Sequence, residues 1–115
     1  MGLVHVTQTK GPLPITIFHL QERVTLENFA ELESAAKDAY GHGMRNAIID
    51  LSQTTALTSI GVRAIIVMHK ILASEPGRHL KLAGPIPEIR DMLDISGVNQ
   101  YVEIYKTVDD AVASF

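Results

Sequence analysis

The residues best suited to chemistry lie between a predicted strand and a predicted helix, in the stretch ALTSIGVRAII over 56–66. Thr58 and Ser59 are adjacent hydroxyls, Gly61 follows two residues after Ser59, and Arg63 lies one helical turn beyond it. A hydroxyl at a helix start can cap the helix by accepting a hydrogen bond from a backbone N–H. It can also carry a phosphate, because unpaired N–H groups and the helix dipole favour an anion there. The residues alone favour Ser59 as a cap, with its phosphorylation as the alternative.

Nucleophilic catalysis is a third possible use of the same serine. Ser59-Ile60-Gly61 matches the second half of the G-x-S-x-G nucleophile elbow, but Leu57 stands where the first glycine belongs. The elbow needs small residues on both sides of its sharp turn. The backbone phosphate cradles GxxxxGK[ST] and GxGxxG are also absent from the sequence. We therefore expect no enzyme activity.

Metal and cofactor chemistry has little support in the sequence. There is no cysteine, and the five histidines show neither H-x-x-x-H nor HExxH spacing. His69 lies on an apolar helix stripe, where a packed histidine is commoner than a ligand. Asp50 ends an apolar strand and is predicted to cap the turn at Ser52 and Gln53. We expect no metal and no cofactor.

Composition narrows the class of protein further. The 115 residues are 46% apolar with a net charge of −3, which suits one domain spanning 1–115. No basic cluster is visible, so nucleic acid is not an expected partner. No apolar stretch approaches the ~20 residues of a membrane span, and no signal peptide is visible. We expect a cytoplasmic protein with no membrane insertion.

The elements that must position the hydroxyls follow from hydrophobic periodicity and from turn residues. Strands are predicted over 2–9, 15–20, 46–51, 79–84 and 101–107. Helices are predicted after Thr25, from Ser59 to about Ser74, over 87–97, and from 108 onward with Thr107 as the cap. The order β-β-α-β-α-β-α-β-α indicates an α/β fold in which helices pack over a mixed sheet. The apolar segment NAIIDL at 46–51 should be its central strand.

Two helices carry further expectations. Thr25 is predicted to cap the first helix, with Glu27 in the first turn and the glycines of GHG at 41–43 ending it. The long helix has a second apolar row, formed by Ala64, Val67, Met68 and Ile71. Burial against a neighbouring helix is the favoured explanation for this row as a whole. Its N-terminal end is expected to form part of a docking surface.

The stretch NAIIDLSQTTALTSIGVRAIIVMHKIL (46–72) resembles the signature of STAS domains, the anti-sigma factor antagonists of bacterial partner-switching systems. That signature is an apolar strand ending in Asp-Leu-Ser, a short connection, and then Asp-Ser-Ser/Thr-Gly-Leu leading into a helix. The segment LAGPIPEIRDMLDISGVNQYVEIYKTVDDAV (82–112) resembles the family's second half. This chain has Thr58 where the family usually has aspartate and Ile60 where it has a small residue.

The resemblance implies a protein-binding module rather than an enzyme. Its partner would be an anti-sigma factor that is often also a serine kinase, which phosphorylates the signature serine, here Ser59. The added charge breaks the complex, and a phosphatase restores it. The implied contact surface covers 53–63, and the predicted partner-binding residues are Thr55, Leu57, Thr58, Ser59, Ile60, Arg63 and Val67. An alternative is a non-phosphorylated STAS scaffold, or a ligand-binding subunit of a signalling or transport assembly.

Overall fold

The computed structural model describes residues 4–10, 13–21, 24–72 and 79–115. Its five strands form one mixed sheet in the order β1-β2-β3-β4-β5. The strands are β1 (Val4–Lys10), β2 (Pro14–Leu20), β3 (Asn46–Asp50), β4 (His79–Ala83) and β5 (Glu103–Tyr105). The helices are α1 (Phe29–Gly41), α2 (Ser59–Leu72), α3 (Pro87–Ser96), the 3₁₀ turn η1 (Val98–Gln100) and α4 (Val108–Ala113). The predicted order of strands and helices is confirmed.

The predicted central strand is also confirmed. β3 pairs in parallel with β2 on one side and with β4 on the other, while β1 pairs antiparallel with β2 at the sheet edge. Ala47, Ile48 and Ile49 are completely buried. A continuously apolar strand of this kind requires cover on both faces of the sheet.

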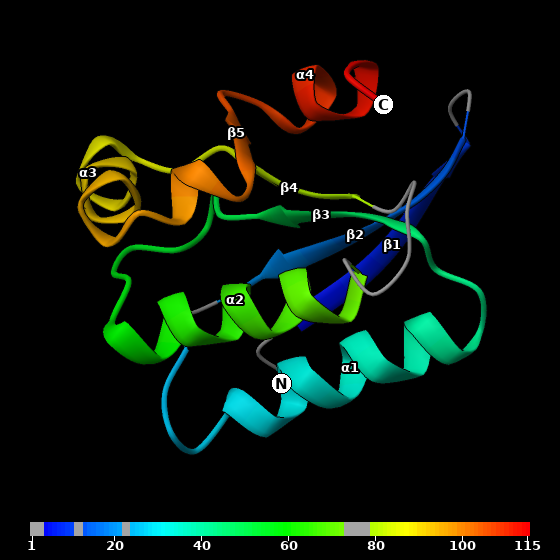
Figure 1. Ribbon diagram of the computed structural model, residues 1–115, viewed down its shortest axis with the longest axis horizontal. Helices are drawn as coiled ribbons and strands as arrows, with labels where there is room; N and C mark the ends of the chain where they lie inside the picture. Colours follow the sequence, from blue (N-terminus) through cyan, green and yellow to red (C-terminus); the bar gives the residue numbers. More distant parts are fainter. Residues whose placement is uncertain (1–3, 11–12, 22–23, 73–78) are drawn as a thin grey trace.

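Helices cover both faces (Figure 1). α1 and α2 lie side by side under one face, and α4 lies over the other. The larger core cluster fills the space between the sheet and α1 and α2, and it includes Phe18 and Leu20 of β2. A smaller cluster under α4 contains Ile15 and Ile17 of the same strand. β2 therefore presents alternate residues to the two layers, as a pleated strand must.

The first helix begins later than predicted. α1 starts at Phe29, because Thr25 and Asn28 first close a tight turn. The Thr25 N–H donates to Asn28 Oδ1 at 2.6 Å, and the Asn28 N–H donates to Thr25 Oγ1 at 3.3 Å. The prediction of Thr25 as the N-cap is wrong, and Glu27 lies in the turn, outside the helix. The acidic residue of the first helical turn is Glu31.

The last strand is shorter than predicted. Gly97 ends α3 with φ +82°, a left-handed conformation that glycine adopts without strain. The chain then forms η1, in which the Tyr101 N–H and the Val102 N–H both donate to the Val98 carbonyl. These turn bonds hold 101 and 102 out of the sheet, so only 103–105 pair with β4.

Other helix ends agree with the sequence. α1 ends at Gly41, and Thr107 caps α4 by accepting the Asp110 N–H at 3.0 Å. The predicted end of α2 near Ser74 lies outside the described residues. Within the described ranges, no helix is long and apolar enough to cross a membrane.

Candidate functional site

Thr58, and not Ser59, caps the start of α2. Its Oγ1 accepts the Gly61 N–H at 3.4 Å, and its carbonyl accepts the Val62 N–H at 3.0 Å. This is the N-cap arrangement, in which a side-chain oxygen satisfies one of the first helical N–H groups. The prediction that Ser59 is the cap is therefore wrong. Ser59 is the first residue of the helix itself, and it is exposed.

The Thr58 hydroxyl also joins two segments that are far apart in sequence. It donates to the carbonyl oxygen of Val24 at 3.2 Å, and Val24 is buried in the larger core cluster. The connection between β2 and α1 is thereby held against the start of α2. Sequence reasoning missed this contact, because nothing in the local pattern links Val24 to Thr58.

A groove opens beside Ser59, between the start of α2 and the start of α1. It has a volume of about 550 Å³ and is lined by Leu26, Phe29, Ala30, Ser59, Ile60 and Arg63. Leu26, in the turn before α1, has 82% of its surface exposed. The predicted residues Ser59, Ile60 and Arg63 thus come together, and α1 and its preceding turn complete the surface. Leu26 is a site residue that sequence reasoning missed.

Two other predicted residues lie on a different groove. Thr55 and Leu57 line a smaller hollow of about 240 Å³ against Glu88, Ile89 and Met92 of α3. Leu57 is half-buried and packs against the larger core. A Cβ at Gly61 would lie 2.5 Å from Leu57 Cδ1, so the glycine allows Leu57 to fold over the first turn of α2. The predicted set is therefore split between two neighbouring surfaces.

The second apolar row of α2 is mostly core. Ala64 and Met68 are only 3% and 1% exposed, so the expectation that they contribute to docking is wrong. Contacts between α1 and α2 bury this side of the helix. Ile71 is half-buried and packs against the same core. Val67 is half-buried, so its predicted role in partner binding stays a prediction.

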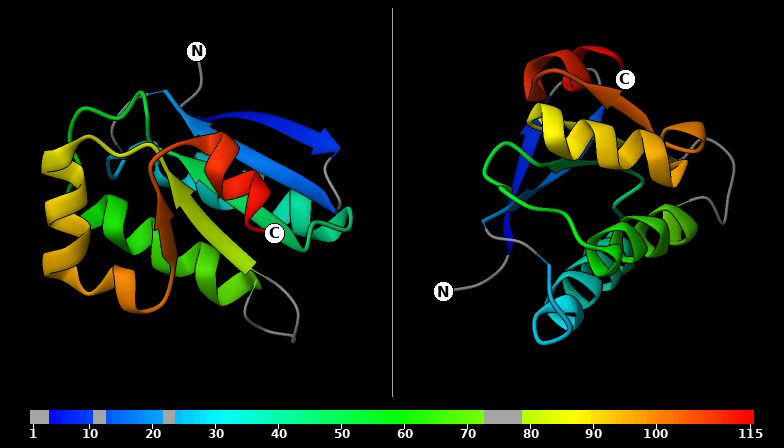
Figure 2. Two further views of the ribbon diagram at one scale, coloured as in Figure 1. Left: turned by 90° about the horizontal axis from the view of Figure 1, so that it is seen from above. Right: turned by 90° about the vertical axis from the view of Figure 1, so that its left-hand side faces the viewer.

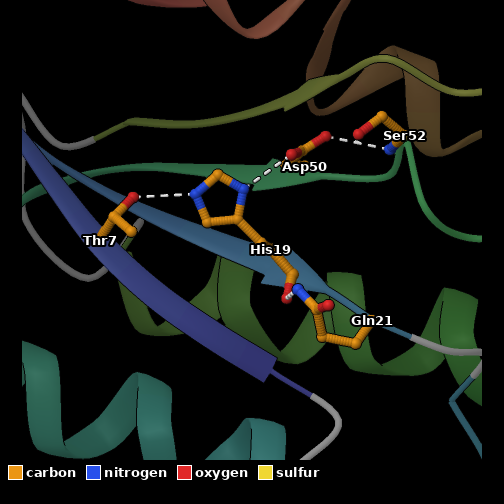
Figure 3. Close-up of polar contacts among 5 residues, drawn as sticks. All are labelled: Thr7, His19, Gln21, Asp50 and Ser52. Carbon is orange, nitrogen blue, oxygen red and sulfur yellow. Dashed lines mark hydrogen bonds and ion pairs between the residues drawn. The ribbon is translucent and has the colours of Figure 1, made fainter.

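Asp50 caps the following turn as predicted, because its Oδ1 accepts the Ser52 N–H at 3.0 Å. Its Oδ2 also lies 2.7 Å from His19 Nδ1, a contact that sequence reasoning missed (Figure 3). Burial by itself raises the pKa of the Asp50 carboxyl. Hydrogen bonds from the Ser52 backbone and side chain and from His19 outweigh that effect, so the pKa lies below its usual value.

His69 packs beside Tyr101, with the ring centroids 6.1 Å apart. It lines an apolar hollow of about 520 Å³ between α2 and η1, together with Ile65, Ile66, Lys70, Val98, Tyr101 and Val102. Among the described residues, no group of three or more histidine, aspartate and glutamate side chains could hold a metal ion.

Comparison with known proteins places the chain in a family. The STAS domain family model matches residues 6–111. A Bordetella bronchiseptica protein, provisionally named anti-sigma factor antagonist BtrV, is 27% identical over 96 residues, which cover 84% of this chain and 82% of that protein.

Solved structures share the fold. An anti-sigma factor antagonist (STAS) domain protein from Planctomyces limnophilus has a TM-score of 0.84 at 15% identity, covering 99% of this chain and 98% of that one. The phosphorylated form of the Bacillus cell fate determinant SpoIIAA has a TM-score of 0.70 at 13% identity, covering 96% and 98%. Because the STAS domain family model matches residues 6–111, nearly the whole sequence, the chain belongs to the STAS domain family.

Proposed function

We propose that this protein is an anti-sigma factor antagonist whose binding to an anti-sigma factor is controlled by phosphorylation of Ser59. The observation that carries the proposal is that two different residues provide the cap and the exposed hydroxyl at the start of α2. Thr58 provides the cap, so the exposed Ser59 hydroxyl is not needed for it. A kinase can therefore modify Ser59 without breaking the helix start.

The surroundings of Ser59 suit a phosphate. Residues in the first turn of a helix present backbone N–H groups and the positive end of the helix dipole. Arg63 lines the same groove one turn further along α2 and supplies a positive charge. A structural relative in the SpoIIAA group is known in a phosphorylated form, which supports the same chemistry here.

The replacement of the usual aspartate by Thr58 does not argue against this proposal. Aspartate and threonine are both N-cap residues, because each side chain has an oxygen that accepts a backbone N–H. Thr58 makes that bond to Gly61. Thr58 itself is the poorer kinase substrate, since its hydroxyl is half-buried and already bonded to Val24.

The groove explains how a phosphate would release the partner. Leu26, Phe29 and Ile60 provide apolar surface directly beside Ser59. A partner side chain that fills this groove must cover the Ser59 position as well. A phosphate adds about −1.5 to −2 charges there, and its desolvation would oppose the contact. Binding would be lost while the domain stays folded.

The proposed function does not include catalysis. Among the described residues, those that line the Ser59 groove include no histidine and no carboxylate that could act as a base for Ser59. A phosphatase that restores the free serine is the second expected partner. Hydrolysis of esters or nucleotides that disappears in Ser59→Ala would contradict this part of the proposal.

The test is affinity capture from the source cell, with mass spectrometry of both the captured protein and the bait. The proposal expects a captured protein with an ATP-binding kinase domain, and a phosphate on Ser59 in part of the bait. Ser59→Ala should keep the partner, and Leu26→Asp should lose it. Capture that does not depend on Leu26, with no phosphate on Ser59, would contradict the proposal.

A second candidate function is binding of a small ligand by an unphosphorylated STAS scaffold. The hollow beside His69 favours it, because an apolar cavity with a few polar groups at its rim is the usual form of a ligand site. Ile66→Trp, at a half-buried position in its lining, would fill that hollow and leave Ser59 untouched. A partner complex that is lost in a folded Ile66→Trp variant but kept in Ser59→Asp would favour this candidate over the first.

A further inference from the structure

Thr7, His19 and Asp50 form a hydrogen-bonded chain across three strands (Figure 3). Thr7 Oγ1 lies 2.8 Å from His19 Nε2, and His19 Nδ1 lies 2.7 Å from Asp50 Oδ2. The sheet register brings them together, because Thr7 pairs with Ile17 of β2 and His19 pairs with Asp50 of β3. All three side chains lie on the face of the sheet that carries α4.

The protons in this chain can be assigned from its chemistry. The Asp50 carboxylate only accepts hydrogen bonds, because its pKa is lowered and its other oxygen already accepts the Ser52 N–H. His19 Nδ1 must therefore carry the hydrogen that Asp50 accepts. In the neutral ring Nε2 is then an acceptor, so the Thr7 hydroxyl donates to it. A hydroxyl, an imidazole base and a carboxylate that orients the base are the three parts of a hydrolase triad.

Thr7 and His19 both keep part of their surface open to solvent. Thr7 is half-buried on the edge strand β1, and 24% of the His19 side chain is exposed. α4 packs on β3, β4 and β5, on the part of this face away from β1 (Figure 2). α1 and α2 lie under the opposite face. Neither helical layer therefore covers Thr7.

We propose that Thr7 is a nucleophilic hydroxyl that accepts an acyl group from activated carboxylic esters, with His19 as its general base. Thr7 Oγ attacks the ester carbonyl carbon while His19 Nε2 takes the hydroxyl proton. The bond from that carbon to the leaving oxygen then breaks, and His19 returns the proton to the leaving group. The products are a threonine ester and an alcohol, with no change of oxidation state. Asp50 is a positioning residue, because it holds the imidazole without touching the ester.

This site is independent of Ser59. The two hydroxyls belong to different elements, and no residue of the Thr7 chain lines the Ser59 groove. Failure of either proposal leaves the other in place. The inference assigns a covalent modification site to a part of the fold outside the Ser59 groove.

The probe is p-nitrophenyl acetate, with release of p-nitrophenol followed by absorbance and the acetylated residue located by peptide mass spectrometry. Thr9 is the matched internal control, since it lies two residues further along β1, on the same face, and is also half-buried. General-base assistance contributes about 10²–10⁴-fold, so Thr7 should be acetylated at least ~100-fold faster than Thr9.

Three variants separate the roles. Thr7→Val keeps a β-branched side chain in the strand and should abolish the fast release, while Thr9→Val should leave it unchanged. His19→Gln should slow acetylation of Thr7 about 100-fold. Equal release from wild type and Thr7→Val would overturn the proposal, as would acetyl groups found only on lysines or on His19.

Asp50→Asn tests the positioning role before any ester is added. Imidazole ¹⁵N NMR should show the Nδ1–H form of His19 in the wild type and a shift toward the Nε2–H form in Asp50→Asn. Acetylation of Thr7 should slow in the same variant, with circular dichroism confirming that it is folded. An unchanged ring proton together with unchanged acetylation would show that Asp50 does not orient the base.

Discussion

The hydroxyl of Thr58 lies 3.2 Å from the carbonyl oxygen of Val24, and this contact fastens the start of α2 to the connection before α1. The same oxygen accepts the N–H of Gly61. Thr58 thus stabilises both segments that border the Ser59 groove. Its neighbour Ser59 is exposed and is available for a different role.

Thr58→Ala should destabilise the protein, and Ser59→Ala should not. Loss of an N-cap costs about 1 kcal/mol, and the Val24 hydrogen bond is lost as well. Ser59→Ala should stay within about 0.5 kcal/mol of wild type, as exposed substitutions usually do. Urea denaturation measures both, and Thr58→Ser, which keeps the hydroxyl, is the control. Equal losses for the two alanine variants would show that Thr58 is not the principal cap.

Leu26→Ala should weaken partner binding without changing stability. In the free protein Leu26 is 82% exposed, so its removal should change the free energy of unfolding little. In a complex the same apolar side chain would be covered by the partner and would contribute to affinity. Ile95 on α3 is a matched control, because it is 84% exposed and does not line the groove. Calorimetric titration with the captured partner should show a loss for Leu26→Ala only. A larger loss for Ile95→Ala would move the interface to α3.

Acid should remove a stabilising contribution from Asp50. Its pKa is lowered by folding, so as pH falls the unfolded chain binds the proton first, and the free energy of unfolding decreases. The contribution is fully present above the usual carboxyl value of 3.8 and is lost as pH falls through the lower folded value. Urea midpoints between pH 6 and pH 3 measure it. The urea midpoint of Asp50→Asn should decrease less steeply with falling pH than that of wild type. Parallel midpoint curves for the two proteins would refute this role of Asp50.

Val67 and Met68 are adjacent on α2 and should behave differently as aspartates. Met68 is 1% exposed, so Met68→Asp buries a charge and should unfold the domain. Val67 is half-buried, and Val67→Asp is expected to stay folded and to weaken partner binding. Circular dichroism reports folding and titration reports binding. If Val67→Asp also unfolds, Val67 belongs to the core and not to the interface.

Much of the fold can be predicted from the sequence, because periodicity and turn residues are local signals. NAIIDL is apolar throughout, and that pattern identifies a strand covered on both faces. The start of α1 differs from the prediction because Thr25 and Asn28 are both capping residues, and only their reciprocal hydrogen bonds show that a turn precedes the helix. The capping preferences of single residues do not decide which of two nearby residues, Thr25 or Asn28, precedes the helix.

The parts of the site that were missed are made by contacts between distant segments. In the sequence Leu26 is an ordinary leucine, and it lines the Ser59 groove in the folded chain, where the Thr58 hydroxyl holds the neighbouring Val24 carbonyl. His19 and Asp50 meet because of the parallel register of β2 and β3. No spacing within either strand encodes that register. Ser59 can be predicted from the sequence because its segment resembles a family signature within a few residues.

The affinity of the captured anti-sigma partner for wild type, Ser59→Ala and Ser59→Asp tests the central claim most directly. The account predicts equal affinity for wild type and Ser59→Ala, and a markedly lower affinity for Ser59→Asp and for protein phosphorylated on Ser59. The phosphorylated form should lose more, because it carries the larger charge. All forms should share one circular dichroism spectrum. Equal affinity for all of them would contradict the claim that Ser59 is the switch.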